Sequence, residues 1–372
     1  MIWRRWAGRH PTGIDRVCLA YLDHFGKDAQ AVVQHRRYRR IVNRQDSDEL
    51  FRVLADPLSR VRPALVKSLL KSALGGRCSG EGRLYLNIGH TGLDDPGFEI
   101  WIRNAGVRPV YLVHDLIPIT HPEYCRAGEQ DRHESRMRTV LKTATGVIGN
   151  SQATIDELAD FSAVQGRSMP PTLAAWLGTS TPRSIQRTGV FPDRPTFVVL
   201  GTIEARKNHL LLLQIWMRLI EKFGADAPRL MIIGQRGWEC DQVFDLLDRN
   251  ETLRTAVEEL GNCSDEAMTR QLASARALLF PSLVEGYGLP LIEALQVGTP
   301  VIASDLPVFR EIGQGIPDFL DPLDASAWED AILSYTKEDG VPRTEQLARM
   351  ERFRAPTWDD HFAKIDSWLA GL

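Results

Sequence analysis

Short apolar runs alternate with amphipathic helical patterns along the chain, and this sequence of elements occurs twice. In the first half, four apolar runs are typical of buried strands: AVVQ (31–34), RLYLNI (83–88), PVYLV (109–113) and GVIGN (146–150). Helical patterns such as GIDRVCLAYLDHF and SRMRTVLKTA accompany them. Strands that alternate with helices in this way predict a parallel sheet with both faces covered.

The second half restarts the pattern. It predicts strands at TFVVLG (196–201), LMIIG (230–234), ALLF (277–280) and PVIAS (300–304), and helices at HLLLLQIWMRLIEKF, after Ser264 and at PLIEALQV (290–297). The segment 179–195 is rich in Thr, Ser, Pro and Arg without a sustained period, which indicates a linker. We therefore predict an α/β protein of two doubly wound, Rossmann-like domains, residues 1–178 and 196–355. Such sheets bind ligands at the carboxyl ends of their strands, so we expect the active site in a cleft between the domains.

Composition narrows the class of protein. The 372 residues exceed what a single core usually supports, and 43% hydrophobic with 25% charged residues is ordinary for a globular protein. A net charge of -3 argues against a nucleic-acid binder. No apolar run approaches the roughly eighteen residues of a spanning helix. The start MIWRRWAGRHPTG lacks the apolar core of a signal peptide, so we expect a cytoplasmic location. Five scattered cysteines indicate neither a zinc site nor a disulfide framework.

Two stretches depart from the regular pattern. In PALVKSLLKSAL the leucines fall at helical spacing opposite Lys67 and Lys71, which is typical either of a helix on an anionic membrane surface or of a helix packed on the sheet with a solvated basic face. At the start, only Met1 to Trp6 precede GRHPTGIDRV. The first strand is therefore expected to be very short or to lie upstream.

The segment EGYGLPLIEA (285–294) combines a glycine loop with a helix start, because Pro290 suits the first helical position and Gly298 can end the helix. Glycines let a ligand approach the backbone, and the N–H groups of a helix start favour an anion such as phosphate. Glu285 and Glu293 would repel a pyrophosphate, so hydroxyl groups of a sugar or ribose suit them better. The alternative is that Glu293 complements the helix dipole and Glu285 is a surface charge.

In GTIEARKNH (201–209), Arg206 and Lys207 stand at the start of the following helix, where cations are unfavourable unless an anion is bound. Such a pair could neutralise a leaving diphosphate, or it could be solvated.

In the first half, TGIDRV places Gly13 in a loop before a helix, and VHDLIP places His114 just past a strand, directed at the cleft or satisfied by backbone groups. His90 is a further candidate of the same kind. The dinucleotide fingerprint, the Walker loop and a metal-ligand cluster are absent from the sequence.

Five segments in this order resemble the large retaining glycosyltransferase family usually called family four, which has the GT-B architecture of two Rossmann-like domains. They are TGIDRV, VHDLIPITHPEY, GVIGNSQAT, GTIEARKNH and FPSLVEGYGLPLIEALQVGTPVIASDLPVFREI. The resemblance implies that Glu285 contacts donor-sugar hydroxyls and Glu293 the ribose. It implies further that Arg206 and Lys207 stabilise the leaving diphosphate and that His114 lies near the reacting sugar. The other implied donor-binding residues are Gly13, Gly201, Gly286, Tyr287, Gly288 and Leu289. Some relatives carry an arginine where Thr202 follows Gly201, so one contact would be lost.

The resemblance also implies the chemistry. Transfer would retain the anomeric configuration without a metal or cofactor, by front-face displacement in which the departing diphosphate oxygen helps deprotonate the acceptor. The donor would be GDP-mannose or a UDP-sugar, and the acceptor a saccharide, most simply one linked to a polyprenyl diphosphate at the inner membrane face. The C-terminal helix, 356–372, would cross back to the first domain, packed by Trp358 and Trp368. A glycoside hydrolase, a nucleotide-sugar epimerase and an inactive sugar-binding homologue are the alternatives.

Overall fold

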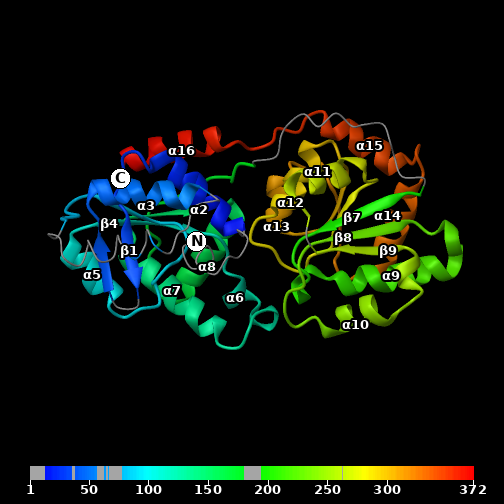
Figure 1. Cartoon of the computed structure of the whole chain (residues 1–372), viewed down its shortest axis with the longest axis horizontal. Helices are drawn as coiled ribbons and strands as arrows, with labels where there is room; N and C mark the ends of the chain where they lie inside the picture. Colours follow the sequence, from blue (N-terminus) through cyan, green and yellow to red (C-terminus); the bar gives the residue numbers. More distant parts are fainter. Residues whose placement is uncertain are drawn as a thin grey trace. The chain divides into compact units, whose positions relative to one another are not determined.

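The computed structural model describes residues 13–35, 38–56, 63, 66, 78–179, 194–261 and 263–372. The chain forms two compact units (Figure 1): unit 1 comprises residues 1–177 and 358–372, and unit 2 comprises residues 178–357. Three sequence predictions concern residues outside the described ones: the first strand before Gly13, the basic helix with Lys67 and Lys71, and most of the linker 179–195. No helix in the described part of the chain is long and apolar enough to cross a bilayer.

Unit 1 contains a four-stranded parallel sheet in the order β3-β4-β5-β6. Its strands are β3 (Leu84–Asn87), β4 (Arg108–Val113), β5 (Gly146–Gly149) and β6 (Thr172–Ala174). The helices between and around them are α5 (Phe98–Ala105), α6 (Ile117–Thr120), α7 (Glu129–Thr143) and α8 (Gln152–Val164). The apolar runs predicted the first three strands. They did not predict β6, whose three half-buried residues carry too short a pattern.

The run AVVQ is a strand, but the prediction that it belongs to the parallel sheet is wrong. It forms β1 (Val32–His35), which pairs antiparallel with β2 (Tyr38–Ile41) in a separate two-stranded sheet. Ala31 and Val33 are buried with Leu50 of α3 (Arg44–Ala55), while Val32, on the other face of β1, packs against the core beneath the parallel sheet. A short apolar run of this kind is found in parallel and in antiparallel strands alike, so the pattern did not predict the partner of β1.

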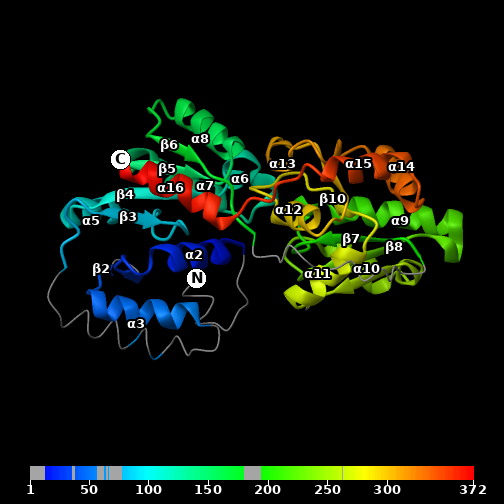
Figure 2. The same ribbon diagram turned by 90° about the horizontal axis from the view of Figure 1, so that it is seen from above.

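The two faces of the sheet in unit 1 are covered by different helices. Helices α5, α7 and α8 pack on the face that carries Tyr111 and Val147. On the other face lies α16 (Trp358–Ala370), the C-terminal helix, which Figure 2 shows in red among the elements of this unit. Gly146 leaves room for Trp368, because a Cβ there would lie 2.5 Å from the indole ring.

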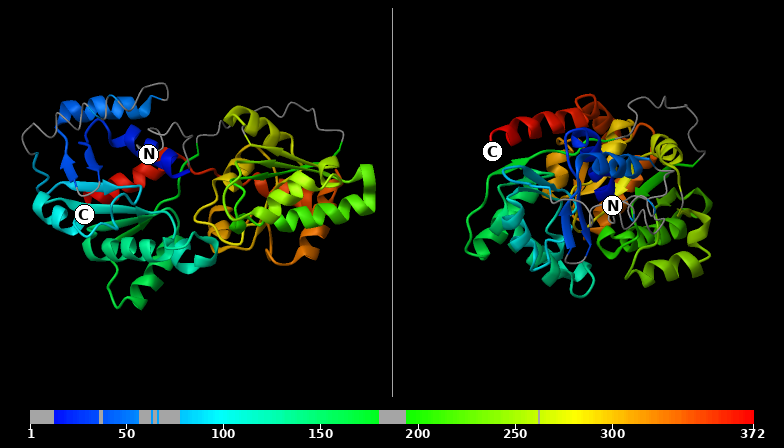
Figure 3. Two further views of the ribbon diagram at one scale, coloured as in Figure 1. Left: turned by 60° about the horizontal axis from the view of Figure 1, so that its bottom comes forward. Right: turned by 60° about the vertical axis from the view of Figure 1, so that its left-hand side comes forward.

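Helix α16 is fastened to α2 (Gly13–Phe25), the helix that begins at the predicted glycine loop; Figure 3 shows the two side by side. His361 of α16 lies 3.0 Å from the hydroxyl of Tyr21, and its Nδ1 lies 2.9 Å from the carbonyl oxygen of Trp176. The ring of His24 stacks on Phe362 at 4.1 Å. These contacts hold the C-terminal helix on unit 1, next to Trp176, where the chain passes from unit 1 to unit 2.

Unit 2 is built on a six-stranded sheet in the order β12-β11-β10-β7-β8-β9, in which all pairs are parallel. Its strands are β7 (Thr196–Leu200), β8 (Arg229–Ile233), β9 (Val257–Leu260), β10 (Leu278–Phe280), β11 (Val301–Ser304) and β12 (Asp318–Leu320). Its helices are α9 (His209–Phe223), α10 (Asp241–Arg249), α11 (Asp265–Ser274), α12 (Leu289–Gln296), α13 (Pro307–Ile312), α14 (Ala325–Thr336) and α15 (Val341–Met350). The pattern missed β9 and β12, because these edge strands are only partly buried and lack a continuous apolar run.

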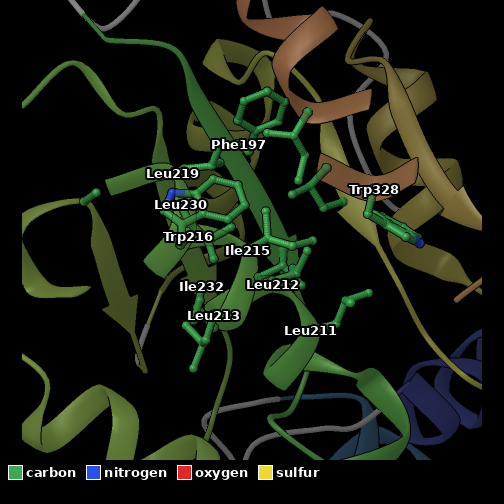
Figure 4. Close-up of a cluster of buried hydrophobic side chains, with 14 of the residues drawn as sticks. Phe197, Leu211, Leu212, Leu213, Ile215, Trp216, Leu219, Leu230, Ile232 and Trp328 are labelled. Carbon is green, nitrogen blue, oxygen red and sulfur yellow. The ribbon is translucent and has the colours of Figure 1, made fainter. Parts of the chain in front are cut away.

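The core of unit 2 gathers around α9. Figure 4 shows Leu212, Ile215, Trp216 and Leu219 of this helix facing the sheet, with Trp328 of α14 beside them. The indole N–H of Trp216 donates to the carbonyl of Pro228 at 2.8 Å, so its burial leaves no polar atom unpaired. This core fixes α9 on the sheet and with it the loop that leads into the helix.

The strand order places a topological switch point between β7 and β10. From β7 the chain proceeds to β8 and β9 on one side, while β10, β11 and β12 lie on the other. The loops that follow β7 and β10, 201–208 and 281–288, therefore leave the same edge of the sheet in different directions. This is where open α/β sheets bind ligands, and it is where the sequence placed both of its second-half motifs.

Candidate functional site

The loop after β7 carries the basic pair. Gly201 has a φ of 133°, and Arg206 and Lys207 lie in a single 3-10 turn, η2 (Ala205–Lys207), before Asn208 at φ 55° leads into α9. The sequence predicted this pair at the start of the helix, but in the structure the pair lies one turn before α9. A Cβ at Gly201 would lie 3.6 Å from Cε of Lys207, an ordinary contact distance, so the positive φ and not the lysine favours glycine at this position.

The loop after β10 has the predicted form of a glycine loop that ends in a helix. Gly288 adopts φ 118°, and a Cβ there would lie 2.7 Å from the ring of Phe309, so this position requires glycine. Helix α12 begins at Leu289 with Pro290 in its first turn, and Gly298 follows the helix with φ 83°. The N–H groups of the start of α12 follow directly on the glycines.

The two loops meet at Glu285. Its carboxylate lies 2.9 Å from Nη1 of Arg206, contacts Nζ of Lys207 and accepts a hydrogen bond from the hydroxyl of Ser282 at 2.8 Å. The backbone N–H of Leu283 donates to the carbonyl of Arg206 at 2.8 Å. The Glu285 side chain is only 7% exposed and that of Lys207 11%. The alternatives in which Glu285 is a surface charge and the basic pair is solvated are therefore wrong.

The electrostatics keep this cluster charged. Burial acts to raise the pKa of Glu285, but the positive charges of Lys207 and Arg206 and the hydrogen bonds from Lys207 and Ser282 outweigh it, and the pKa falls to about 2. Burial lowers the pKa of Lys207, and Glu285 opposes this effect. Glu285 and Lys207 thus hold each other in their ionised forms.

Glu204, to which the sequence assigned no role, completes the cluster. Its Oε2 lies 3.2 Å from Nε of Arg206, and the residue is 8% exposed. Burial raises the pKa of Glu204, while the charges of Arg206 and Lys207 act against the rise. The residue was visible in GTIEARKNH, but only the fold shows that its side chain turns towards the basic pair.

The remaining predicted donor-binding residues lie on the same loop and helix. Gly286 and Tyr287 precede Gly288, and Tyr287 is buried. Glu293 is the fifth residue of α12 and 7% exposed, so it lies just past the first helical turn. Because the dipole effect fades within the first turn, complementing the dipole is a poor account of a carboxylate buried here. Its contact with a ribose stays a prediction.

In unit 1, His114 follows β4 and is buried. Its Nε2 lies 2.7 Å from the carbonyl oxygen of Ile88, which can only accept, so Nε2 carries the proton and Nδ1 is left as the acceptor of the neutral ring. Burial lowers the pKa of His114, with the Ile88 carbonyl and Asp115 opposing it. The alternative that backbone groups satisfy His114 is therefore correct for one ring nitrogen, Nε2. The other, Nδ1, is available for chemistry.

A cluster of hydrogen bonds holds the turn that carries His114. The amide of Asn150 donates to the carbonyl of His114 at 2.8 Å, and Nε2 of His133 lies 3.1 Å from the carbonyl of Asp115. The His90 ring, with φ 54° at its backbone, lies 5.5 Å from the His114 ring and binds the carbonyl of Leu112 at 2.9 Å. These contacts between a ring nitrogen and a backbone carbonyl fix the orientations of the His90, His114 and His133 rings.

No group of three or more His, Cys, Asp or Glu side chains in the described ranges could hold a metal ion. Gly13 is the exposed first residue of α2 in unit 1, and His114 belongs to the same unit. The Glu285 cluster belongs to unit 2. The structure brings together Gly201, Arg206, Lys207 and Glu285, while the joining of these residues with Gly13 and His114 in one cleft stays a prediction.

Comparison with known proteins shows which sequences and folds this chain resembles. Residues 180–350 match the family described as Glycosyl transferases group 1. The serotype-specific mannosyltransferase WbdA of Escherichia coli is 31% identical over 265 residues, which cover 66% of this chain and 32% of WbdA. The O-antigen chain mannosyltransferase B of Escherichia coli is 28% identical over 267 residues, 68% of each chain. This chain thus spans about a third of the length of the WbdA relative.

Among solved structures, HepE of Anabaena in complex with UDP-glucose matches with a TM-score of 0.66 at 15% identity, covering 98% of this chain and 97% of HepE. At that identity the likeness concerns the fold. It confirms the prediction of two Rossmann-like, parallel-sheet domains of the GT-B class.

Proposed function

We propose that this chain, whose residues 180–350 match the family described as Glycosyl transferases group 1, transfers a hexose from a nucleoside-diphosphate sugar to a saccharide or lipid-linked saccharide acceptor, with retention of configuration. The observation that carries this proposal is the buried contact of Arg206 and Lys207 with Glu285 at the switch point of unit 2, beside the glycine loop and the start of α12. Two cations, the N-terminal end of a helix and a carboxylate in one place suit a sugar attached to a diphosphate.

Each side chain of the cluster around Glu285 would have its own role in the reaction. Arg206 and Lys207 would stabilise the negative charge that develops on the departing diphosphate, and the start of α12 would bind its oxygens. Glu285, now paired with both cations, would accept hydrogen bonds from donor-sugar hydroxyls once the diphosphate takes over the cations. Glu293 would bind the ribose. Two positioned cations would supply the charge that a metal ion supplies elsewhere, so the proposed reaction needs no metal.

His114 would contribute from unit 1. Its Nδ1 is an acceptor in the neutral ring, so it would receive a hydrogen bond from a hydroxyl of the reacting sugar. No base on the protein is required, because an oxygen of the departing diphosphate would take the proton of the acceptor hydroxyl on the same face. The protein would then act by positioning and by charge stabilisation, with Gly13 and α2 bordering the diphosphate.

We propose mannose as the sugar and GDP-mannose as the donor, with a UDP-sugar as the second choice. The names of the mannosyltransferase relatives support the first, and the UDP-glucose complex of HepE supports the second. The acceptor would be a surface-polysaccharide chain on a polyprenyl diphosphate, met at the cytoplasmic face of the membrane.

The purified chain should be screened for nucleotide release against GDP-mannose and a panel of UDP- and GDP-sugars. Glu285→Ala and Lys207→Ala should abolish transfer, while the exposed α9 controls Glu221→Ala and Lys222→Ala, and added EDTA, should leave it unchanged. Full activity in either site variant, or loss of activity with EDTA, would refute the mechanism. Isomerised nucleotide sugar in the absence of any acceptor would point to an epimerase instead.

A further inference from the structure

The charges of the cluster in unit 2 balance within the protein. Arg206 and Lys207 carry two positive charges, and Glu204 and Glu285 carry two negative ones, all on side chains that are at most 23% exposed. Arg206 is shared: its Nε lies 3.2 Å from Oε2 of Glu204, and its Nη1 lies 2.9 Å from Oε2 of Glu285. A diphosphate that binds here must therefore compete with two carboxylates for the same cations.

The two carboxylates have different neighbours. Glu285 contacts both cations and Ser282, and in the proposed function it turns to sugar hydroxyls when the diphosphate binds the cations. Glu204 is held by the neighbouring loop: Ile203 forms a parallel bridge with Arg236, and the N–H of Gly237 donates to the carbonyl of Ile203 at 3.0 Å. A Cβ at Gly237 would lie 2.9 Å from Cγ of Glu204, so the two loops pack without a gap at this point. Glu204 thus stays beside Arg206 when a ligand arrives.

We propose that Glu204 is a further functional residue of this site: a fixed counter-charge on Arg206 that weakens the binding of the nucleoside diphosphate product and so lets it leave. The inference rests on the proposed function, because it requires that a nucleoside diphosphate binds to the pair Arg206 and Lys207. A carboxylate fixed near a bound anion repels it, and one such interaction in a partly buried site changes affinity by roughly tenfold. A purely structural ion pair would instead position Arg206, and its loss would weaken binding.

The test is the affinity of GDP and UDP, measured by calorimetry, for the native chain and for Glu204→Gln. The glutamine has the same shape and can still accept the hydrogen bond from Nε of Arg206, so the substitution removes the charge and keeps the contact. We expect roughly tenfold tighter binding of the diphosphate, a smaller gain for the nucleoside monophosphate and none for the nucleoside. The gain should shrink as salt is added. Glu204→Asp, which keeps the charge, should bind within about twofold of the native chain.

The control is Glu221→Gln, the same change at an exposed position of α9, which should alter no affinity. Equal or weaker binding of the diphosphate by a folded Glu204→Gln overturns the inference, as does an equal gain for the uncharged nucleoside. Glu204→Ala serves as a second neutral variant, and failure of both neutral variants to fold would show that the residue is structural and overturn the inference as well. Absence of any diphosphate binding by the native chain would instead refute the proposed function.

Discussion

Replacing Glu285 by Gln should destabilise unit 2 through the two cations that the carboxylate holds. The substitution keeps the shape of the side chain and the contact with Ser282, but it removes the charge that faces Lys207 and Arg206. Because Lys207 is 11% exposed, its ammonium group cannot regain solvation without moving. The experiment therefore measures what a buried ion pair contributes inside this site.

The magnitude follows from the pKa of Glu285. Its fall from 4.5 to about 2 on folding corresponds to roughly 3 kcal/mol in favour of the ionised form at neutral pH. The pKa of Lys207 is also lowered, because burial costs the lysine more than its partner returns. The net contribution of the pair is therefore smaller, and we expect Glu285→Gln to lower the free energy of unfolding by about 2 kcal/mol. For a unit of this size the melting temperature should fall by about 4–8 °C.

The assay is a double-mutant cycle of Glu285→Gln and Lys207→Met. Urea unfolding is monitored by tryptophan fluorescence. Hydrogen exchange of peptides from β7 and β10 serves as a local probe of stability. The cycle cancels effects that the two substitutions do not share. We expect a coupling energy of about 2 kcal/mol. A coupling below about 0.5 kcal/mol, the value of an exposed ion pair, would refute the reasoning.

The pH dependence supplies a second check. Since the folded-state pKa of Glu285 is depressed, its contribution is present above about pH 4.5 and is lost as the pH falls towards about 2. Glu285→Gln should lack this component of acid denaturation. Native and variant chains that lose stability in parallel across this range would contradict the assignment.

Two further substitutions test the elements that support the site. Gly288→Ala places a Cβ 2.7 Å from Phe309 at φ 118°, so the melting temperature should fall by several degrees and donor binding should weaken, as thermal unfolding and calorimetry would show; an unchanged melting temperature would contradict it. His361→Phe loses the contact with Tyr21, so hydrogen exchange should quicken in α2 and α16. Because burial lowers the pKa of His361 to about 4, the native chain, unlike the variant, should lose stability as the pH falls from 6.5 towards 4.

The sequence predicted the local features of the site because each depends on neighbours along the chain. A glycine loop followed by a proline in the first turn of a helix is a short-range pattern, and Gly288, Pro290 and Gly298 occupy the expected kinds of position. The long apolar runs likewise identified β4, β7 and β8, which are buried on both faces. The pattern did not predict β6, β9 and β12, because these strands have too few buried residues. It predicted β1 as a strand but assigned it to the wrong sheet.

The contacts within the candidate site depended on tertiary structure. Arg206 and Glu285 are 79 residues apart, and only the order of β7 beside β10 brings their loops to one edge of the sheet. The same holds for the Asn150 amide, which donates to the carbonyl of His114 from a loop 36 residues away. By itself the sequence determined which residues have the chemistry for a sugar diphosphate, because residue type and local backbone preference are properties of short segments. That the charges of Arg206 and Lys207 face Glu285 was decided by the packing of loops that lie far apart in the chain.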